Sequence, residues 1–160
     1  MATKAKHYAS EGARSLTPHL TVKGAKQAIE FYKRAFGAVV KGVSEDPSGL
    51  VLHSQLMIGD SLLFLNDEFP AMGAKGPLTL GGTPVTIHLF VPDADKTFDT
   101  AVAAGAKVAM PMGDQFWGDR YGMVIDPFGH SWSISTHLED LTPDEIMERM
   151  KKAMATMGQH

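Results

Sequence analysis

Two histidines, His19 and His88, occupy the same place in two similar short segments of the chain. A neutral imidazole can act as a general base near neutral pH, because its unperturbed pKa is about 6.5, and it is a common metal ligand. His53 lies on a third alternating segment and could join them. These residues predict a general-base pair, His19 and His88, or a metal site of all three; hydrogen-bonded histidines without either role are the structural alternative.

The two histidines belong to an internal repeat. Residues 16–22 (LTPHLTV) and 85–91 (VTIHLFV) share Thr, His, Leu and Val, and His19 and His88 are 69 positions apart. Residues two apart on a strand share a face, so each histidine should share a face with the threonine before it, Thr17 or Thr86. The repeat predicts that the chain is built from two related halves.

Each half has the apolar spacing of a strand, a helix and three more strands. A segment rich in Gly and Pro separates the halves, and Thr142-Pro-Asp-Glu145 has the residues of a helix start. We therefore expect an α+β fold divided as follows: a disordered N-terminal tail, 1–15; a first βαβββ module, 16–66; a linker, 67–83; a second βαβββ module, 84–138; and a C-terminal helix and tail, 139–160.

Composition excludes several classes of protein. The 160 residues include no cysteine, which excludes disulfides, thiolate metal sites and a cysteine nucleophile. The net charge of −3 lacks the basic excess of a nucleic-acid-binding protein. No apolar run approaches the ~18 residues of a membrane span, and the polar N-terminal residues do not have the pattern of a signal peptide. We expect a cytoplasmic protein that contacts neither nucleic acid nor membrane.

Five segments carry a resemblance to a known family: 28–38 (AIEFYKRAFGA), 88–94 (HLFVPDA), 103–106 (AAGA), 115–122 (QFWGDRYG) and 126–132 (DPFGHSW). In these segments the chain resembles the vicinal oxygen chelate superfamily, which includes glyoxalase I, bleomycin-resistance proteins and dioxygenases, and in particular its PhnB-like branch. The resemblance implies two tandem βαβββ modules that form a cupped eight-stranded mixed sheet around a small molecule.

In metal-dependent members of that superfamily, four side chains on the cupped sheet hold one divalent ion. The resemblance puts these positions at Thr17, Thr86, Ser133 and either Leu63 or Phe64, none of which is a usual ligand. We therefore expect no superfamily metal, and we expect Thr17, Thr86 and Ser133 to line the cavity. A divalent metal shifted to His19, His53 and His88 is the alternative, and no cofactor is firmly implied.

Two further side chains are candidates for ligand binding. Arg120 could clamp a carboxylate or phosphonate through its planar fork of donors; the structural alternative is an ion pair with Asp119 or another acid. Trp117 could stack on a ligand at the mouth of the cavity, or it could cover the strand ends. With the histidines and hydroxyls, the predicted substrate-binding set is Thr17, His19, His53, Thr86, His88, Trp117, Arg120 and Ser133.

Three functions are consistent with these residues. The first is a glyoxalase-like or bleomycin-resistance-like protein that binds a small metabolite or xenobiotic without the usual metal. The second is a metal-dependent lyase, isomerase or dioxygenase acting on a substrate with vicinal oxygens. The third is a domain whose sheet serves only dimerisation. A stripe on the C-terminal helix (Ile146, Met147, Met150 and Met154) predicts a homodimer in which this helix is buried.

Overall fold

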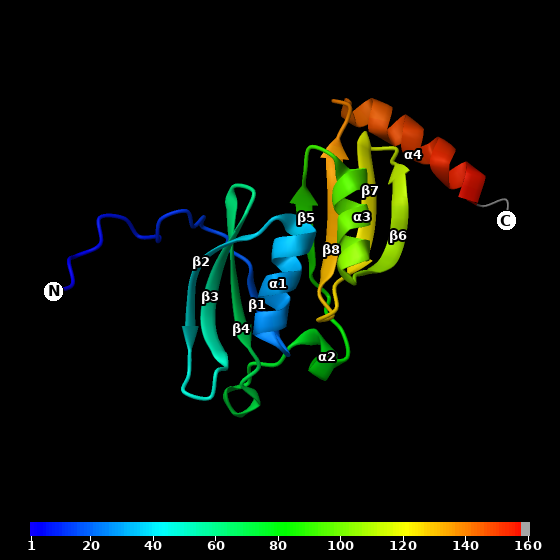
Figure 1. Cartoon of the computed structure of the whole chain (residues 1–160). Coiled ribbons are helices and arrows are strands. Elements are labelled where there is room, and N and C mark those ends of the chain that lie inside the picture. The colour runs from blue at the N-terminus through cyan, green and yellow to red at the C-terminus, as the bar shows by residue number, and fades with distance from the viewer. Residues whose placement is uncertain (158–160) are drawn as a thin grey trace. The chain divides into compact units, whose positions relative to one another are not determined.

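The computed structural model describes residues 1–157, and the chain divides into two compact units, the first ending at Thr83 and the second beginning at Pro84. Each unit contains one βαβββ module with a four-stranded mixed sheet and a helix on one face of that sheet (Figure 1). The expected α+β class and the two tandem modules are confirmed. The eight strands form two sheets of four.

The first sheet has the strand order β1-β4-β3-β2, in which β1 and β4 are parallel and the other neighbours are antiparallel. Helix α1 packs on this sheet through apolar residues spaced three and four apart, and it ends at Gly37, whose φ is 66°. The elements of the first module are β1 (His19–Val22), α1 (Ala25–Phe36), β2 (Val39–Glu45), β3 (Val51–Ile58) and β4 (Ser61–Asp67).

The second sheet repeats this plan with the order β5-β8-β7-β6 and a parallel β5–β8 pair. Helix α3 covers one face, and its first turn is capped by Asp93, which accepts from the backbone N–H of Lys96. The elements are β5 (Thr86–Phe90), α3 (Ala94–Ala104), β6 (Lys107–Asp114), β7 (Asp119–Ile125) and β8 (Ser131–His137).

The remaining segments are less regular. The expected linker carries two short helices, η1 (Pro70–Met72) and α2 (Pro77–Leu80). In the expected N-terminal tail, Gly12 lies close to the side chains of Met57 and Leu62. Helix α4 (Pro143–Met157) begins with the expected reciprocal contacts between Thr142 and Glu145, and residues 158–160 lie outside the described part of the chain.

Helix α4 buries none of its described residues. Met147 and Met154 are exposed, and Ile146 and Met150 are half-buried. None of the helices described over residues 1–157 is long and apolar enough to cross a membrane.

The strand register confirms the internal repeat residue by residue. His19 pairs with Phe64 across the parallel β1–β4 pair, and His88 pairs with Ser133 across β5–β8. Both pairs therefore correspond at the same separation of 69 positions. The register also resolves one ambiguity of the sequence: the residue equivalent to Ser133 is Phe64 rather than Leu63.

Candidate functional site

Each sheet has one face covered by its helix and one face turned away from it, here called the open face. Side chains alternate between the two faces along a strand. In the first unit, Leu20 and Val22 are buried on the helix side, so His19 and Thr21 lie on the open face. The neighbouring strands add His53, Gln55, Phe64 and Asn66 to that face.

Asn66 anchors His19 on the open face of the first unit. The amide nitrogen of Asn66 donates to the Asp67 carbonyl at 2.7 Å and to the Thr21 hydroxyl at 3.3 Å. The amide oxygen is therefore the atom that faces His19 Nε2, at 2.7 Å. Since this oxygen can only accept, Nε2 carries a proton and donates it.

Aromatic contacts complete this cluster. The rings of His19 and His53 meet edge to face with their centroids 5.9 Å apart, and Phe64 lies 4.9 Å from His53. Gln55 is 3.5 Å from the Nε2 of His53. The first unit thus brings together two of the three histidines singled out from the sequence.

On the open face of the second unit, His88 is anchored by a serine. Its Nδ1 lies 2.7 Å from the hydroxyl of Ser133, which is 1% exposed. The ring is nearly parallel to Tyr121, at 5.9 Å between centroids, and meets Phe90 edge to face at 4.4 Å. Partial enclosure of the ring lowers the pKa of His88, and the charge of Asp119 opposes that shift only in part.

Asp119 is a buried carboxylate at the start of β7, and it organises the edge of this face. It accepts hydrogen bonds from the indole of Trp117 at 3.1 Å, the hydroxyl of Ser135 at 3.2 Å and Nδ1 of His137 at 2.7 Å. Burial alone would raise the pKa of Asp119, but these three donors lower it overall. The hydrogen bond to Asp119 therefore fixes the orientation of the Trp117 indole.

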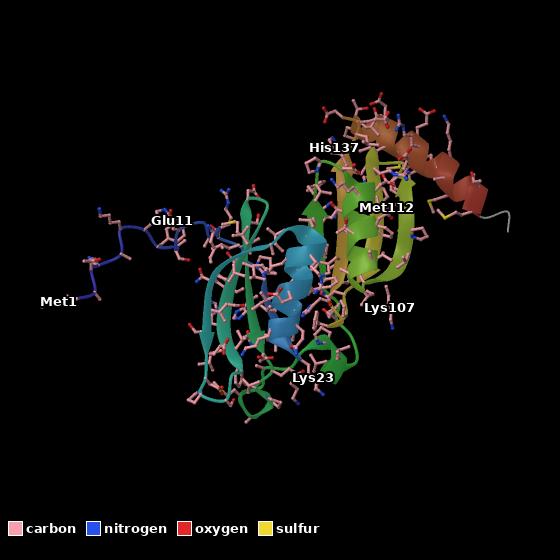
Figure 2. All side chains as sticks on the ribbon, viewed as in Figure 1. Met1, Glu11, Lys23, Lys107, Met112 and His137 are labelled. Carbon is pink, nitrogen blue, oxygen red and sulfur yellow. The ribbon has the colours of Figure 1, made fainter. Side chains whose placement is uncertain are left out.

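His137 lies at the end of β8, where the chain turns toward α4 (Figure 2). Its Nε2 is 3.0 Å from Asp140, so the imidazole bridges two carboxylates. Hydrogen bonds to Asp140 and then to Asp119 raise the pKa of His137. The sequence analysis did not single out His137, Tyr121 or Phe90. Continuing the alternation from His88 on β5, from Asp119 on β7 and from Ser133 on β8 would have placed all three on this face.

The predicted hydroxyl residues have different surroundings. Thr17 precedes β1, and its hydroxyl donates to the carbonyl of Arg14 at 2.9 Å. Thr86 lies on the open face beside His88, with its hydroxyl 3.2 Å from that of Ser131. Ser133 lies beneath the ring of His88. His88 and Thr86 belong to the second unit, whereas His19 and His53 belong to the first.

Arg120 lies on the helix side of its strand. Its guanidinium makes two hydrogen bonds to Asp95 of α3, at 2.8 and 2.9 Å, and one to Asp114 at 3.2 Å. The pairing lowers the pKa of Asp95 and raises that of Arg120. The structure does not bring Arg120 together with His88 or Trp117, and the acids that engage it are Asp95 and Asp114 rather than Asp119.

The residues at the four positions where the resemblance puts the superfamily ligands do not fit a divalent ion. Phe64 offers no donor atom, and the hydroxyls of Thr17, Thr86 and Ser133 contact other protein groups. Over residues 1–157, no group of three or more histidine, cysteine, aspartate or glutamate side chains is placed to hold a metal ion.

A surface hollow of about 420 Å³ lies in the first unit beside the start of α1. Lys23, which is labelled in Figure 2, is one of the residues that line it. Lys26, Gln27 and Glu68 also line it. The backbone N–H groups of Gly24 and Ala25 at this helix end donate to Asp67. The helix end is thus occupied by a protein carboxylate, and the hollow is formed by different residues from the histidine clusters.

Comparison with known proteins shows which family has this arrangement. The model of the family described as Glyoxalase/Bleomycin resistance protein/Dioxygenase superfamily matches residues 5–134. An uncharacterised protein of Mycobacterium tuberculosis strain H37Rv is 48% identical over 139 residues, which cover 85% of this chain and 82% of the relative.

Solved structures agree with that match. The crystal structure of the Arabidopsis thaliana At5g48480 gene product is 30% identical, with a TM-score of 0.63, over 76% of this chain and 98% of the other. Protein PA1353 from Pseudomonas aeruginosa is 25% identical, with a TM-score of 0.64, over 79% of this chain and all of the other.

Proposed function

The chain belongs to the Glyoxalase/Bleomycin resistance protein/Dioxygenase superfamily, and we propose that it binds a small metabolite or xenobiotic on the open faces of its sheets without the superfamily metal. The observation that carries this proposal is the set of residues at the four positions expected to hold the ligands, Thr17, Phe64, Thr86 and Ser133. Serine and threonine hydroxyls are poor ligands for a divalent ion and a phenyl ring has no donor atom, so the neighbouring histidines and aromatic rings are the groups proposed to bind an organic ligand.

The proposed binding groups lie on both open faces. In the first unit they are His19 and His53, with Asn66 behind His19. In the second unit they are Thr86, His88 and Trp117, with Ser133 behind His88. If the ligand is a substrate, His19 is the proposed general base, because Asn66 holds its Nε2 and leaves the Nδ1 lone pair to face a ligand. His88, the other histidine expected in that role, has its Nδ1 engaged by Ser133.

We propose that the chain belongs to the PhnB-like branch of the superfamily. The segments 115–122 and 126–132 support it, and a Bacillus cereus structure described as a PhnB protein shares the fold at 17% identity. We also propose a cytoplasmic homodimer. The exposed methionines of α4 support dimerisation, because an apolar stripe of this kind gains free energy when it is buried.

The test is a ligand screen of the full chain, purified without a histidine tag and analysed for metal content. Metabolites and xenobiotics, including glycopeptide drugs, are screened by thermal shift with and without EDTA. Ligand-induced stabilisation that EDTA leaves unchanged supports the proposal. One tightly bound zinc, nickel or iron per chain, required for stabilisation, would overturn it in favour of a metal-dependent enzyme.

A further inference from the structure

The hydrogen bond between Ser133 and His88 determines which ring atom of His88 is available to a ligand. The Ser133 hydroxyl is 1% exposed, and within the described chain its hydrogen-bond partner is His88 Nδ1. A buried hydroxyl proton needs an acceptor, because leaving it unpaired costs free energy. The hydroxyl therefore donates to Nδ1, and the neutral ring carries its own proton on Nε2.

The surroundings of His88 favour the neutral imidazole over the charged one. Enclosure beside Tyr121 and Phe90 disfavours the charged ring, and this lowers the pKa of His88. Asp119, the charged neighbour that favours protonation, has its carboxylate engaged by Trp117, Ser135 and His137. At neutral pH His88 thus offers one N–H donor at Nε2.

Flat rings lie beside the ring of His88. Tyr121 is nearly parallel to His88, Trp117 meets Tyr121 edge to face at 5.3 Å, and Phe90 is 64% exposed. Aromatic faces and edges of this kind favour stacked or T-shaped contacts with planar ring systems. Between these rings, strand β8 contributes three small buried side chains to the same face, Ser131, Ser133 and Ser135.

The charges near His88 favour an uncharged ligand. The carboxylate of Asp119 is held by three donors, and His137 lies between Asp119 and Asp140. Arg120, the cation that follows Asp119 in the chain, is on the helix side of β7 and engaged by two other acids. A ligand carboxylate at His88 would therefore meet a neutral N–H donor, while the cation Arg120 lies on the other face of the sheet.

We propose that the open face of the second unit binds a flat, uncharged, conjugated carbonyl compound. Its carbonyl oxygen accepts a hydrogen bond from His88 Nε2, and its rings stack on Tyr121 and Phe90. Ser133 is a positioning residue that acts through His88 by fixing the proton on Nε2. This inference rests on the proposed function and narrows its ligand class.

The first test reads the proton position directly, by ¹⁵N NMR of the histidine rings in the full chain. In the wild type, His88 should show an unprotonated Nδ1 and a protonated Nε2. Ser133→Ala should shift part of the population to a protonated Nδ1, and Ser133→Thr should restore the wild-type pattern. Ser54→Ala removes another fully buried serine hydroxyl, in the first unit, and is the control for a structural effect. A wild-type spectrum with the proton on Nδ1 overturns the inference, whether or not the variants fold.

The second test uses 9-fluorenone and fluorene, two flat probes that differ by the carbonyl oxygen, titrated by calorimetry. The wild type should bind fluorenone about tenfold more tightly than fluorene, a ratio of the size expected for one hydrogen bond. His88→Phe keeps a ring but removes the donor, and it should bind the two probes equally. Fluorenone-4-carboxylate should bind more weakly than fluorenone.

The outcomes separate this inference from the proposed function. Equal binding of fluorenone and fluorene to the wild type, or no binding of fluorenone, overturns the inference. The proposed function survives either result if other small molecules stabilise the protein in the thermal-shift screen. If ligand-induced stabilisation requires a bound metal, the proposed function is overturned. The NMR measurement still decides which ring nitrogen of His88 carries the proton.

Discussion

The two units hold equivalent histidines by different ring atoms. His19 is anchored through Nε2, which donates to Asn66, so its Nδ1 lone pair is left for a ligand. His88 is anchored through Nδ1, which accepts from Ser133, so its Nε2–H is left. One unit thus offers an acceptor and the other a donor. The duplicated backbone fixes where a histidine stands, but the neighbour on the adjacent strand decides what it can bind.

The helix starts differ in the same way. The backbone N–H of Ala25 in α1 donates to the carboxylate of Asp67, which also accepts from Gly24 and Val51. The equivalent N–H of Ala94 in α3 donates to the hydroxyl of Thr136, which in turn donates to the carbonyl of Val91. Asp67 is a carboxylate that accepts from three backbone N–H groups, whereas Thr136 is a hydroxyl that accepts from one. The two side chains should therefore contribute differently to the free energy of unfolding.

The largest expected effect follows from that difference. Asp67→Ala leaves three backbone N–H groups without their acceptor, and it should lower the free energy of unfolding by about 3–5 kcal/mol. Thr136→Ala should cost about 1–2 kcal/mol. Urea-induced unfolding of both variants measures the two values. Equal losses would show that the two units stabilise their helix starts to the same degree.

The turns before β3 and β7 provide the second comparison. Gly118 and Gly49 both have positive φ values, +97° and +87°. A Cβ added to Gly118 would lie 2.6 Å from the carbonyl oxygen of Glu139. A Cβ added to Gly49 would meet only the side-chain nitrogen of Lys26, at 3.4 Å. Gly118→Ala should destabilise the protein by about 2–4 kcal/mol, because strain and overlap add. Gly49→Ala should cost about 1 kcal/mol, from strain alone. Thermal unfolding of the pair checks this, and a larger loss at Gly49 would contradict it.

The two units also differ in the ion pairs that join each helix start to its sheet, and removing these pairs should affect stability less than the glycine substitutions do. Lys26 of α1 pairs with Glu45 at 2.9 Å, whereas in the second unit Arg120 bridges Asp95 and Asp114. Arg120→Ala leaves two carboxylates facing one another and should lower the melting temperature more than Lys26→Ala does. Ligand affinity should not change, because Arg120 lies on the helix side. A selective loss of ligand-induced stabilisation in Arg120→Ala would restore Arg120 as a binding residue.

The smallest expected effect is a pH dependence in the second unit. The raised pKa of His137 means that its stabilising contribution is complete below pH about 6.5 and is lost as the pH rises through the folded-state value. The lowered pKa of His88 acts in the other direction, because its cost to stability disappears as the pH rises toward about 6.5. Stability should therefore be greatest near pH 6.5.

Denaturation midpoints between pH 5 and 9 measure this dependence. His137→Gln should remove the decline on the alkaline side, and His88→Phe should remove the rise on the acid side. A decline that survives in His137→Gln would show that another group causes it.

Local patterns predicted much of the fold. The order expected for each half, a strand, a helix and three more strands, is the order β1-α1-β2-β3-β4 in the first unit and β5-α3-β6-β7-β8 in the second. The spacing of apolar residues and the glycines at element ends are enough to predict these elements, because both signals depend only on residues close in sequence. The repeat, visible as four shared residues in seven, correctly anticipated the equivalent positions of His19 and His88.

Contacts between distant elements were harder to predict. Asp119 follows Trp117 closely and precedes Arg120, so an ion pair with Arg120 was a natural expectation. The alternation of β7 sends the two side chains to opposite faces, where Asp119 meets Trp117 and His137, and Arg120 meets Asp95. The roles of Asn66 and Ser133 depend on the β1–β4 and β5–β8 registers, which single-strand periodicity does not contain.

The parallel pairing of the first and last strands of each module also has a kinetic consequence. His19 and Phe64 are 45 positions apart, as are His88 and Ser133. Closing such a long loop is entropically costly before its contacts form, so β1 and β5 should join their sheets after the local hairpins β3–β4 and β7–β8. Because the loops are equally long, loop closure should slow the two units equally, and any difference in their folding rates should come from side chains.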